Sequence, residues 1–196
     1  MFESLLVEPK EGTMRKIIVE AEVSIDGVMG QNMDFWEHIF PFHTPDVAEY
    51  LNDLLFMPDA LLMGQKTYTF FAQVWPERQG EQADRINSMP KYVASRTLKE
   101  PLQWNATLLK GDVAEEIRKL KQEPGKSLLQ YGVGELTNTM LKHNLVDEFH
   151  FLVFPFTFGE GLRIFEGMEV NTLKLLDTKT FSSGAVVLIY QPANTK

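Results

Sequence analysis

The sequence predicts an α/β fold: a mostly parallel central sheet covered by helices, with antiparallel strands at its C-terminal edge. Short apolar, β-branched segments alternate with amphipathic ones through the first part of the chain, a pattern typical of parallel strands joined by helices. The last strand-like segments follow one another too closely for helical crossovers, so we expect them to pair antiparallel. Gly and Pro are spread evenly and mark no linker, which predicts one domain over residues 14–196 behind a loose tail at residues 1–13.

The first elements are expected from residue 16 onward. Lys16–Val23 (KIIVEAEV) is apolar and β-branched and predicts a buried strand. Residues 34–44 are rich in aromatic side chains, and we expect no regular element there. Pro45–Phe56 predicts a helix, because Thr44 can cap it and proline suits the first helical position.

The remaining elements follow the same two patterns. Ser182-Ser183-Gly184 separates two closing strands in the manner of a hairpin turn. The expected strands are Asp59–Met63, Lys91–Ser95, Thr107–Leu109, Ser127–Tyr131, Glu148–Phe154, Leu173–Thr180 and Ala185–Tyr190. The expected helices are Lys66–Val74, Asp112–Gln122 and Gly134–His143.

Composition narrows the classes of partner. The formal net charge of -8 argues against nucleic acid or an anionic membrane surface as the main partner. The chain has no cysteine, which excludes disulfides and thiolate metal sites and fits a reducing, cytoplasmic setting. The four histidines have no metal-ligand spacing, so we expect no metal. No apolar run approaches the length of a membrane span.

Four spaced segments are suited to binding an anionic cofactor. Val23–Gly30 (VSIDGVMG) turns the chain after the first strand, where glycines permit close approach to a ligand. Met63–Thr67 (MGQKT) and Gln130–Leu136 (QYGVGEL) each join a strand to a helix N-terminus, whose free N–H groups favour phosphate. Val93–Thr97 (VASRT) places Ser and Arg at a strand end. Taken singly, each segment also fits an ordinary turn, cap or strand end.

Together these segments resemble the dihydrofolate reductase-like superfamily. Within it, the chain is most similar to small bacterial proteins that resemble the C-terminal reductase domain of the bifunctional riboflavin-biosynthesis protein, over about residues 14–191. The resemblance implies a three-layer fold, an NADPH cofactor and reduction by hydride transfer. The cofactor contacts it implies are Gly30, Met63, Gly64, Lys66, Thr67, Ser95, Arg96, Thr97, Gly132, Val133, Gly134, Glu135 and Leu136.

The chain departs from the family pattern in ways that bear on cofactor and substrate. Gln65 replaces the arginine of the second segment, and Val133 stands where dihydrofolate reductases carry a second glycine. Met89 and Ala48 stand where folate chemistry requires charge. The riboflavin-pathway enzymes usually have acidic residues where Tyr131 and Phe71 stand here. These differences argue against folate reduction and weaken the fit to a phosphosugar substrate.

Candidate catalytic residues are Asp26, in the first segment, and Glu49, next to the family's acidic position. Trp36, Asp46, Tyr50 and Phe71 are the candidate substrate contacts, and the aromatic ones fit core or dimer packing equally well. The apolar run Phe149–Phe158 exceeds what one sheet face needs, so we expect a homodimer.

Three functions remain open at this point. The first is an NADPH-dependent reductase of a small heterocyclic or carbonyl compound. The second is the riboflavin-biosynthesis reductase that acts on 5-amino-6-(5-phosphoribosylamino)uracil. The third is a non-catalytic dimeric binding protein on the same fold, since a fold does not fix a function.

Overall fold

The computed structural model describes residues 14–30 and 33–193, so the tail predicted at residues 1–13 lies outside the described residues. The chain divides into two compact units. The first unit consists of Met1–Ile17 and Asn52–Gln130, and the second consists of Ile18–Leu51 and Tyr131–Lys196. The strands belong to an eight-stranded sheet that is mostly parallel and ends in antiparallel strands, as the sequence predicts.

In the first unit, all strand pairs are parallel and run in the order β4-β3-β2-β5. These strands are β2 (Pro58–Gly64), β3 (Lys91–Ala94), β4 (Ala106–Leu108) and β5 (Ser127–Tyr131). The helices of this unit are α3 (Gln65–Val74), η2 (Trp75–Glu77), α4 (Glu81–Ser88) and α5 (Val113–Gln122). Asp112 caps α5 by accepting a 3.0 Å hydrogen bond from the Glu115 N–H.

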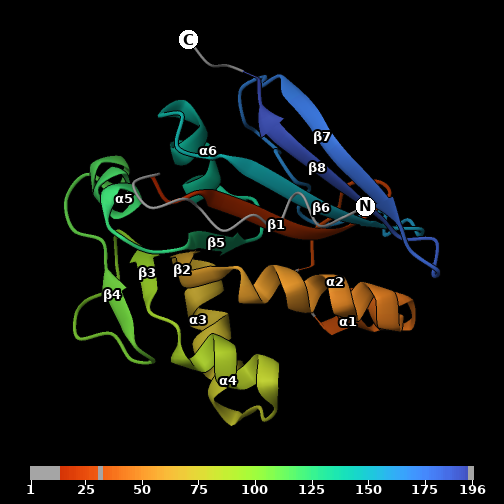
Figure 1. Cartoon of the computed structure of the whole chain (residues 1–196), viewed down its shortest axis with the longest axis horizontal. Coiled ribbons are helices and arrows are strands. Elements are labelled where there is room, and N and C mark those ends of the chain that lie inside the picture. The colour runs from red at the N-terminus through yellow and green to blue at the C-terminus, as the bar shows by residue number, and fades with distance from the viewer. Residues whose placement is uncertain (1–13, 31–32, 194–196) are drawn as a thin grey trace. The chain divides into compact units, whose positions relative to one another are not determined.

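In the second unit, β1 pairs with β6 in parallel, and β8 joins β6 to β7 in antiparallel pairs. The strands are β1 (Ile17–Ser24), β6 (Glu148–Phe154), β7 (Leu173–Thr180) and β8 (Val186–Pro192). The helices are α1 (Met33–Ile39), η1 (Phe40–Phe42), α2 (Pro45–Phe56) and α6 (Glu135–Lys142). Figure 1 shows the long hairpin of β7 and β8 beside β6. This hairpin confirms the antiparallel edge predicted from the close spacing of the last strands.

One face of β6 carries the core of the second unit. Leu152 and Phe154 pack there with Phe35 and Ile39 of α1 and Val47 of α2, all buried. Phe149 and Phe151 are buried as well, so these rings of the apolar run expose no surface for a second copy. The homodimer therefore stays a prediction.

Two of the described α-helices were not expected from the sequence. The prediction of no regular element at residues 34–44 is wrong, because α1 and η1 occupy most of that range. Phe35 and Ile39 are four residues apart and share the buried face of α1, but the many surrounding aromatics hide that period. The second missed helix, α4, buries only Ala83 and Ile86 in an otherwise polar segment, which leaves little periodic signal.

Candidate functional site

In the first unit, the carboxyl ends of β2 and β3 lie side by side, because Gly64 and Ala94 are register partners. The chain passes from Gly64 directly into α3, whose N-cap has no side-chain hydrogen bond. No atom lies within 4 Å of the place that a Cβ on Gly64 would take. The first turn of α3 therefore presents main-chain N–H groups beside open space, an arrangement that favours an anion.

Gln65 links the two strand ends. Its Oε1 accepts hydrogen bonds of 2.7 Å from the hydroxyl groups of both Ser95 and Thr97. The Ser95 hydroxyl also accepts from the N–H groups of Thr97 and Leu98, at 3.1 and 2.9 Å. Since both lone pairs of Ser95 Oγ are used, its proton must go to Gln65 Oε1, which fixes the orientation of the amide. The Nε2 group of Gln65 is then the donor end of the linkage.

The other predicted cofactor residues of the first unit surround this linkage. Met63 is fully buried in β2, and Thr67 is half-buried in the first turn of α3. Lys66 and Arg96 are exposed, one on α3 and one directly after β3. The structure thus brings a helix N-terminus, the Gln65 amide and the segment Ser95–Thr97 together within one unit.

In the second unit, the main-chain N–H groups of the predicted glycine turn, Gly132–Gly134, already donate to other groups of the protein. Gly132 donates to the Glu20 carbonyl oxygen at 2.7 Å, and Gly134 donates to Thr137 Oγ1 at 3.1 Å. The Val133 nitrogen lies 3.2 Å from Met29 Sδ. Because these donors are committed, an anion here would meet the first turn of α6, where Glu135 is exposed and Leu136 is buried.

The peptide bond between Gly132 and Val133 is trans, since the cis bond found among the described residues joins Glu100 to Pro101. Gly132 has a φ of +78°, a region that favours glycine. Gly30 is required for a different reason. A Cβ there would lie 2.6 Å from the Phe35 ring, so any larger residue would force that ring to move.

Asp26 ties two loops of the second unit together. Its carboxylate accepts hydrogen bonds from Ser24 Oγ at 2.7 Å and from the N–H groups of Phe158 and Gly159 at 3.0 and 2.9 Å. The bond from Ser24 is the largest cause that lowers the pKa of Asp26 to about 2, followed by the bond from Phe158. Asp26 is therefore ionised at neutral pH and holds the loop after β6 against the loop after β1.

The predicted residues near α2 have different surroundings. Glu49 is exposed on α2. Asp46 accepts hydrogen bonds from Thr44 and from the N–H and hydroxyl groups of Ser182, which lower the pKa of Asp46 below its usual range. Tyr50 Oη lies 2.6 Å from His150 Nδ1 on β6. Asp46 thus joins α2 to the β7–β8 turn, while Tyr50 faces a polar part of the sheet.

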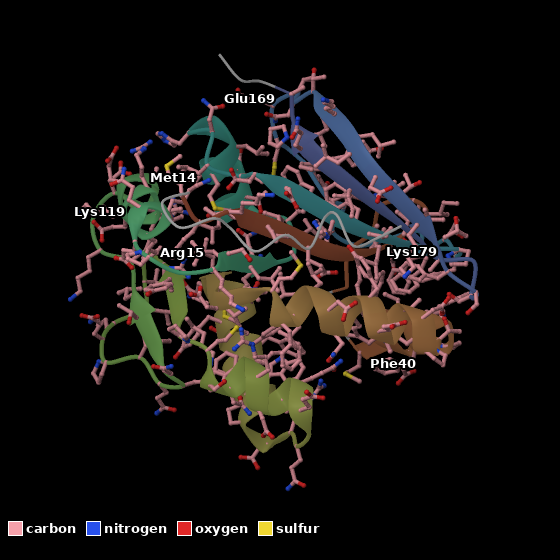
Figure 2. The ribbon with its side chains drawn as sticks, viewed as in Figure 1. Met14, Arg15, Phe40, Lys119, Glu169 and Lys179 are labelled. Atoms are coloured by element: carbon pink, nitrogen blue, oxygen red, sulfur yellow. The ribbon has the colours of Figure 1, made fainter. Side chains whose placement is uncertain are left out.

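The other two predicted aromatic contacts, Trp36 and Phe71, lie in separate units. Trp36 is half-buried on α1 and meets Phe35 edge-on at 6.1 Å between ring centroids. Phe71 packs on α3 against Phe70 and Trp75. Phe40, at the start of η1, keeps an exposed ring (Figure 2).

Sequence reasoning missed a polar cluster in the second unit. Glu20 and Glu22 on β1 lie two residues apart, and His43 Nε2 lies 2.9 Å from Glu22 Oε2. His150, next to Glu20 in the register of β1 and β6, lies 3.3 Å from Glu148 through its Nε2. The sequence carries a signal for this polar cluster, because two glutamates interrupt an otherwise apolar strand in KIIVEAEV.

A surface cavity of about 470 Å³ lies beside α1, against the loop that Asp26 holds. It is lined by Asp34, His38, Thr157, Phe158, Glu160 and Gly161. Two carboxylates in the lining disfavour a phosphate there. Within residues 14–30 and 33–193, no three metal-ligating side chains are grouped, and no helix is long and apolar enough to cross a membrane.

Comparison with known proteins places these features in a family. The chain matches the RibD C-terminal domain family over residues 15–187. The protein YyaP of Bacillus subtilis (strain 168) is 33% identical over 183 residues, which cover 90% of this chain and 94% of YyaP. This match extends almost the full length of both proteins.

Solved structures agree on the fold. A protein of Shewanella sp. PV-4 assigned to riboflavin biosynthesis superposes with a TM-score of 0.70 at 22% identity, covering 91% of this chain and 99% of that one. Dihydrofolate reductase of Enterococcus faecalis, complexed with NADP(H) and RAB-propyl, gives a TM-score of 0.59 at 12% identity, covering 93% of this chain and 99% of that one. These likenesses confirm the dihydrofolate reductase-like fold. The chain belongs to the RibD C-terminal domain family.

Proposed function

We propose that this chain is a reductase that uses NADPH to transfer hydride to a small heterocyclic or carbonyl compound. Membership of the RibD C-terminal domain family supports a reductase of the RibD type. The observation that carries the cofactor assignment is the linkage in the first unit, where Gln65 joins the start of α3 to Ser95 and Thr97. This linkage holds a donor amide and a helix N-terminus beside the open space at Gly64.

The residues present fit a phosphorylated dinucleotide. The N–H groups of the first turn of α3 and the Nε2 group of Gln65 would bind phosphate oxygens. The exposed cations Lys66 and Arg96 would bind the 2′-phosphate that distinguishes NADPH from NADH, since a guanidinium can donate two parallel hydrogen bonds to phosphate. When bound, the nicotinamide supplies the hydride.

In the second unit, the first turn of α6 is a further candidate for binding phosphate, because the N–H groups of Gly132–Gly134 are already engaged. Asp26 would act as a positioning residue that holds the two neighbouring loops in place. Glu49, exposed on α2, remains a candidate for contact with substrate. Tyr50, Trp36, Asp46 and Phe71 stay candidate substrate contacts.

Titration of the protein with NADPH and with NADH, followed by nucleotide fluorescence, tests this proposal. We expect NADPH to bind more tightly than NADH, and we expect Arg96→Ala to lower the affinity for NADPH at least tenfold while changing that for NADH little. Lys174→Ala, an exposed residue on β7, is the matched control for loss of one positive charge. Absence of binding by either nucleotide at millimolar concentration would overturn the proposal and favour a non-catalytic binding protein.

A second candidate is reduction of 5-amino-6-(5-phosphoribosylamino)uracil, which the family membership favours. Oxidation of NADPH should be followed with this compound, with dihydrofolate and with simple aldehydes and ketones as separate acceptors. Growth of a riboflavin auxotroph that carries this chain would favour the pathway enzyme. Failure to restore growth, together with turnover of another acceptor, would support the broader assignment.

A further inference from the structure

Strand β1 places two glutamates on one face of the second unit. Glu20 and Glu22 are two residues apart, so both side chains point to the same side of the sheet. In the register of β1 and β6, Glu20 lies opposite His150, and Glu22 lies opposite Leu152, which packs in the core with Val47 of α2. The two carboxyl groups therefore lie on the face that α2 covers.

The environments of the two carboxyl groups differ. Glu20 is only 3% exposed, and its Oε1 is buried without a hydrogen-bond partner among the described residues. Burial, and then the charge of Glu22, raise the pKa of Glu20 well above its ordinary range. Glu22 keeps some exposure and is paired with His43. Two neighbouring acids in such different settings can take different roles in a proton transfer, one as the buried donor and one as the relay toward solvent.

Other titratable groups of the second unit lie near Glu20, namely His150, Tyr50 and Tyr131. From α2, Tyr50 Oη lies 2.6 Å from His150 Nδ1, and the other ring nitrogen of His150 lies 3.3 Å from Glu148. Because a carboxylate can only accept, His150 donates through Nε2 to Glu148, and a neutral ring then accepts a hydrogen bond from the Tyr50 hydroxyl group at Nδ1. Burial first, and then the charge of Glu20, raise the pKa values of both Tyr50 and Tyr131. Glu148 and Asp177 of β7 act on Tyr50 in the same direction.

The buried acid is also connected to the glycine turn. The carbonyl oxygen of Glu20 accepts a 2.7 Å hydrogen bond from the Gly132 N–H, in the segment that precedes the first turn of α6. An unpaired, buried carboxyl oxygen costs free energy unless something compensates for it. The main-chain bond places the strand that carries the Glu20 carboxyl group directly beside the turn that precedes α6.

We propose that Glu20 is the proton donor of the reduction, with Glu22 and His43 as its route to solvent. This inference rests on the proposed function. As hydride adds to the acceptor carbon, the π bond of its C=N or C=O group breaks, and the electron pair moves to the heteroatom. That atom takes the Glu20 proton, so the acceptor is reduced and the nicotinamide is oxidised. The Glu20 carboxylate then regains a proton from solvent through His43 and Glu22.

The protonation state can be measured without any substrate. Infrared difference spectra of the carboxyl C=O stretch, recorded as the pH is raised, should show a protonated carboxyl in the wild type at pH 7. Glu20→Gln should remove this signal, and Glu37→Gln, on the exposed side of α1, should keep it. Glu22→Gln should move the titration of the Glu20 carboxyl group to lower pH, because a nearby negative charge is lost. A wild type without the signal, or a Glu20→Gln variant that retains it, would overturn the proposal.

Turnover tests the catalytic role. Glu20→Gln should lower kcat about 10²–10⁴-fold, the usual contribution of a general acid, and should leave the NADPH Kd unchanged. The wild-type kcat should fall at high pH as Glu20 loses its proton, whereas the residual kcat of the variant should lack that decline. If Glu20→Gln does not fold, Glu20→Asp, which keeps the acid but shortens its reach, should show the same pH decline at a lower kcat. Equal turnover by wild type and variant at every pH would refute the role of Glu20 and leave the proposed function intact. A wild type that binds no nucleotide would instead refute the proposed function.

Discussion

The main-chain N–H of Gly132 donates a 2.7 Å hydrogen bond to the carbonyl oxygen of Glu20. This bond joins the turn before α6 to the centre of β1, and it occurs at a residue whose φ is +78°. Met29 lies against the same turn, with its Sδ 3.2 Å from the Val133 nitrogen. A Cβ added to Gly132 would lie only 3.1 Å from that sulfur atom. Backbone conformation and packing both restrict this position to glycine.

Gly132→Ala should therefore destabilise the protein by about 1–3 kcal/mol, the usual cost of forcing a side chain into the left-handed region. Denaturant unfolding measures the free energy of unfolding of each variant. Gly134→Ala is the matched control, because its φ is extended and no atom lies within 4 Å of the added Cβ. We expect a smaller loss there. Equal losses for the two variants would show that the backbone of Gly132 is not restrictive.

Gln65→Glu tests the acceptor role and the donor role of the Gln65 amide separately. A carboxylate still accepts from Ser95 and Thr97, so stability should change little. The donor Nε2 is lost and a negative charge is added, so the affinity for NADPH should fall at least tenfold, or about 1.4 kcal/mol. Fluorescence titration measures the Kd. Gln73→Glu, an exposed position on the same helix, makes the same charge change as the control. An unchanged NADPH affinity of Gln65→Glu would show that Gln65 does not contact the phosphate.

Asp26→Asn should loosen the loop that contains Phe158 and Gly159, because an amide cannot accept as many hydrogen bonds as the carboxylate does. The folded pKa of about 2 lies below the ordinary value of roughly 3.9. The contribution of Asp26 to stability is therefore fully present above the ordinary value and is lost as the pH falls toward 2. The difference in unfolding free energy between wild type and Asp26→Asn should accordingly shrink over that window. A difference that stays constant with pH would contradict this interpretation.

Lys91 is the most deeply buried of the buried cations described in the first unit. It is fully buried, its Nζ donates to the Asn87 carbonyl at 2.8 Å, and it lies 4.1 Å from the Trp104 ring centroid. Burial lowers the pKa of Lys91 to about 8. Between that value and the ordinary one of roughly 10.4, the unfolded chain binds more protons, so stability should rise with pH in this window.

Lys91→Met keeps the length of the side chain and removes the titration. Compared with this variant, the wild type should gain up to about 1.4 kcal/mol of unfolding free energy per pH unit above pH 8. Chemical denaturation at several pH values between 7 and 10.5 measures the difference. Lys99→Met, at an exposed lysine, is the matched control for the change of side chain. Parallel pH profiles for wild type and Lys91→Met would contradict the assignment.

The sequence by itself determined most of the elements of this fold. β-Branched runs, the Asp112 cap and the Ser182–Gly184 turn act locally, so the strands, α5 and the hairpin could be predicted from neighbouring residues alone. The segments around Gly64 and Gly132 could likewise be identified as strand-to-helix turns. Helix α1 could not, because burial of Phe35 and Ile39 depends on packing against β6 and its following loop.

Only the tertiary structure decided which main-chain N–H groups are already hydrogen-bonded and which carboxyl groups are buried. Sequence spacing assigned the glycine turn to the pyrophosphate, yet its N–H groups bind Glu20, Met29 and Thr137. Asp26 was assigned to catalysis, and its carboxylate is surrounded by donors that keep it ionised. Glu20 resembled an ordinary charged residue in a strand until β6 and α2 were seen to bury it. The physical reason is that hydrogen bonds and desolvation join residues far apart in the chain, whereas propensity and spacing describe only neighbours.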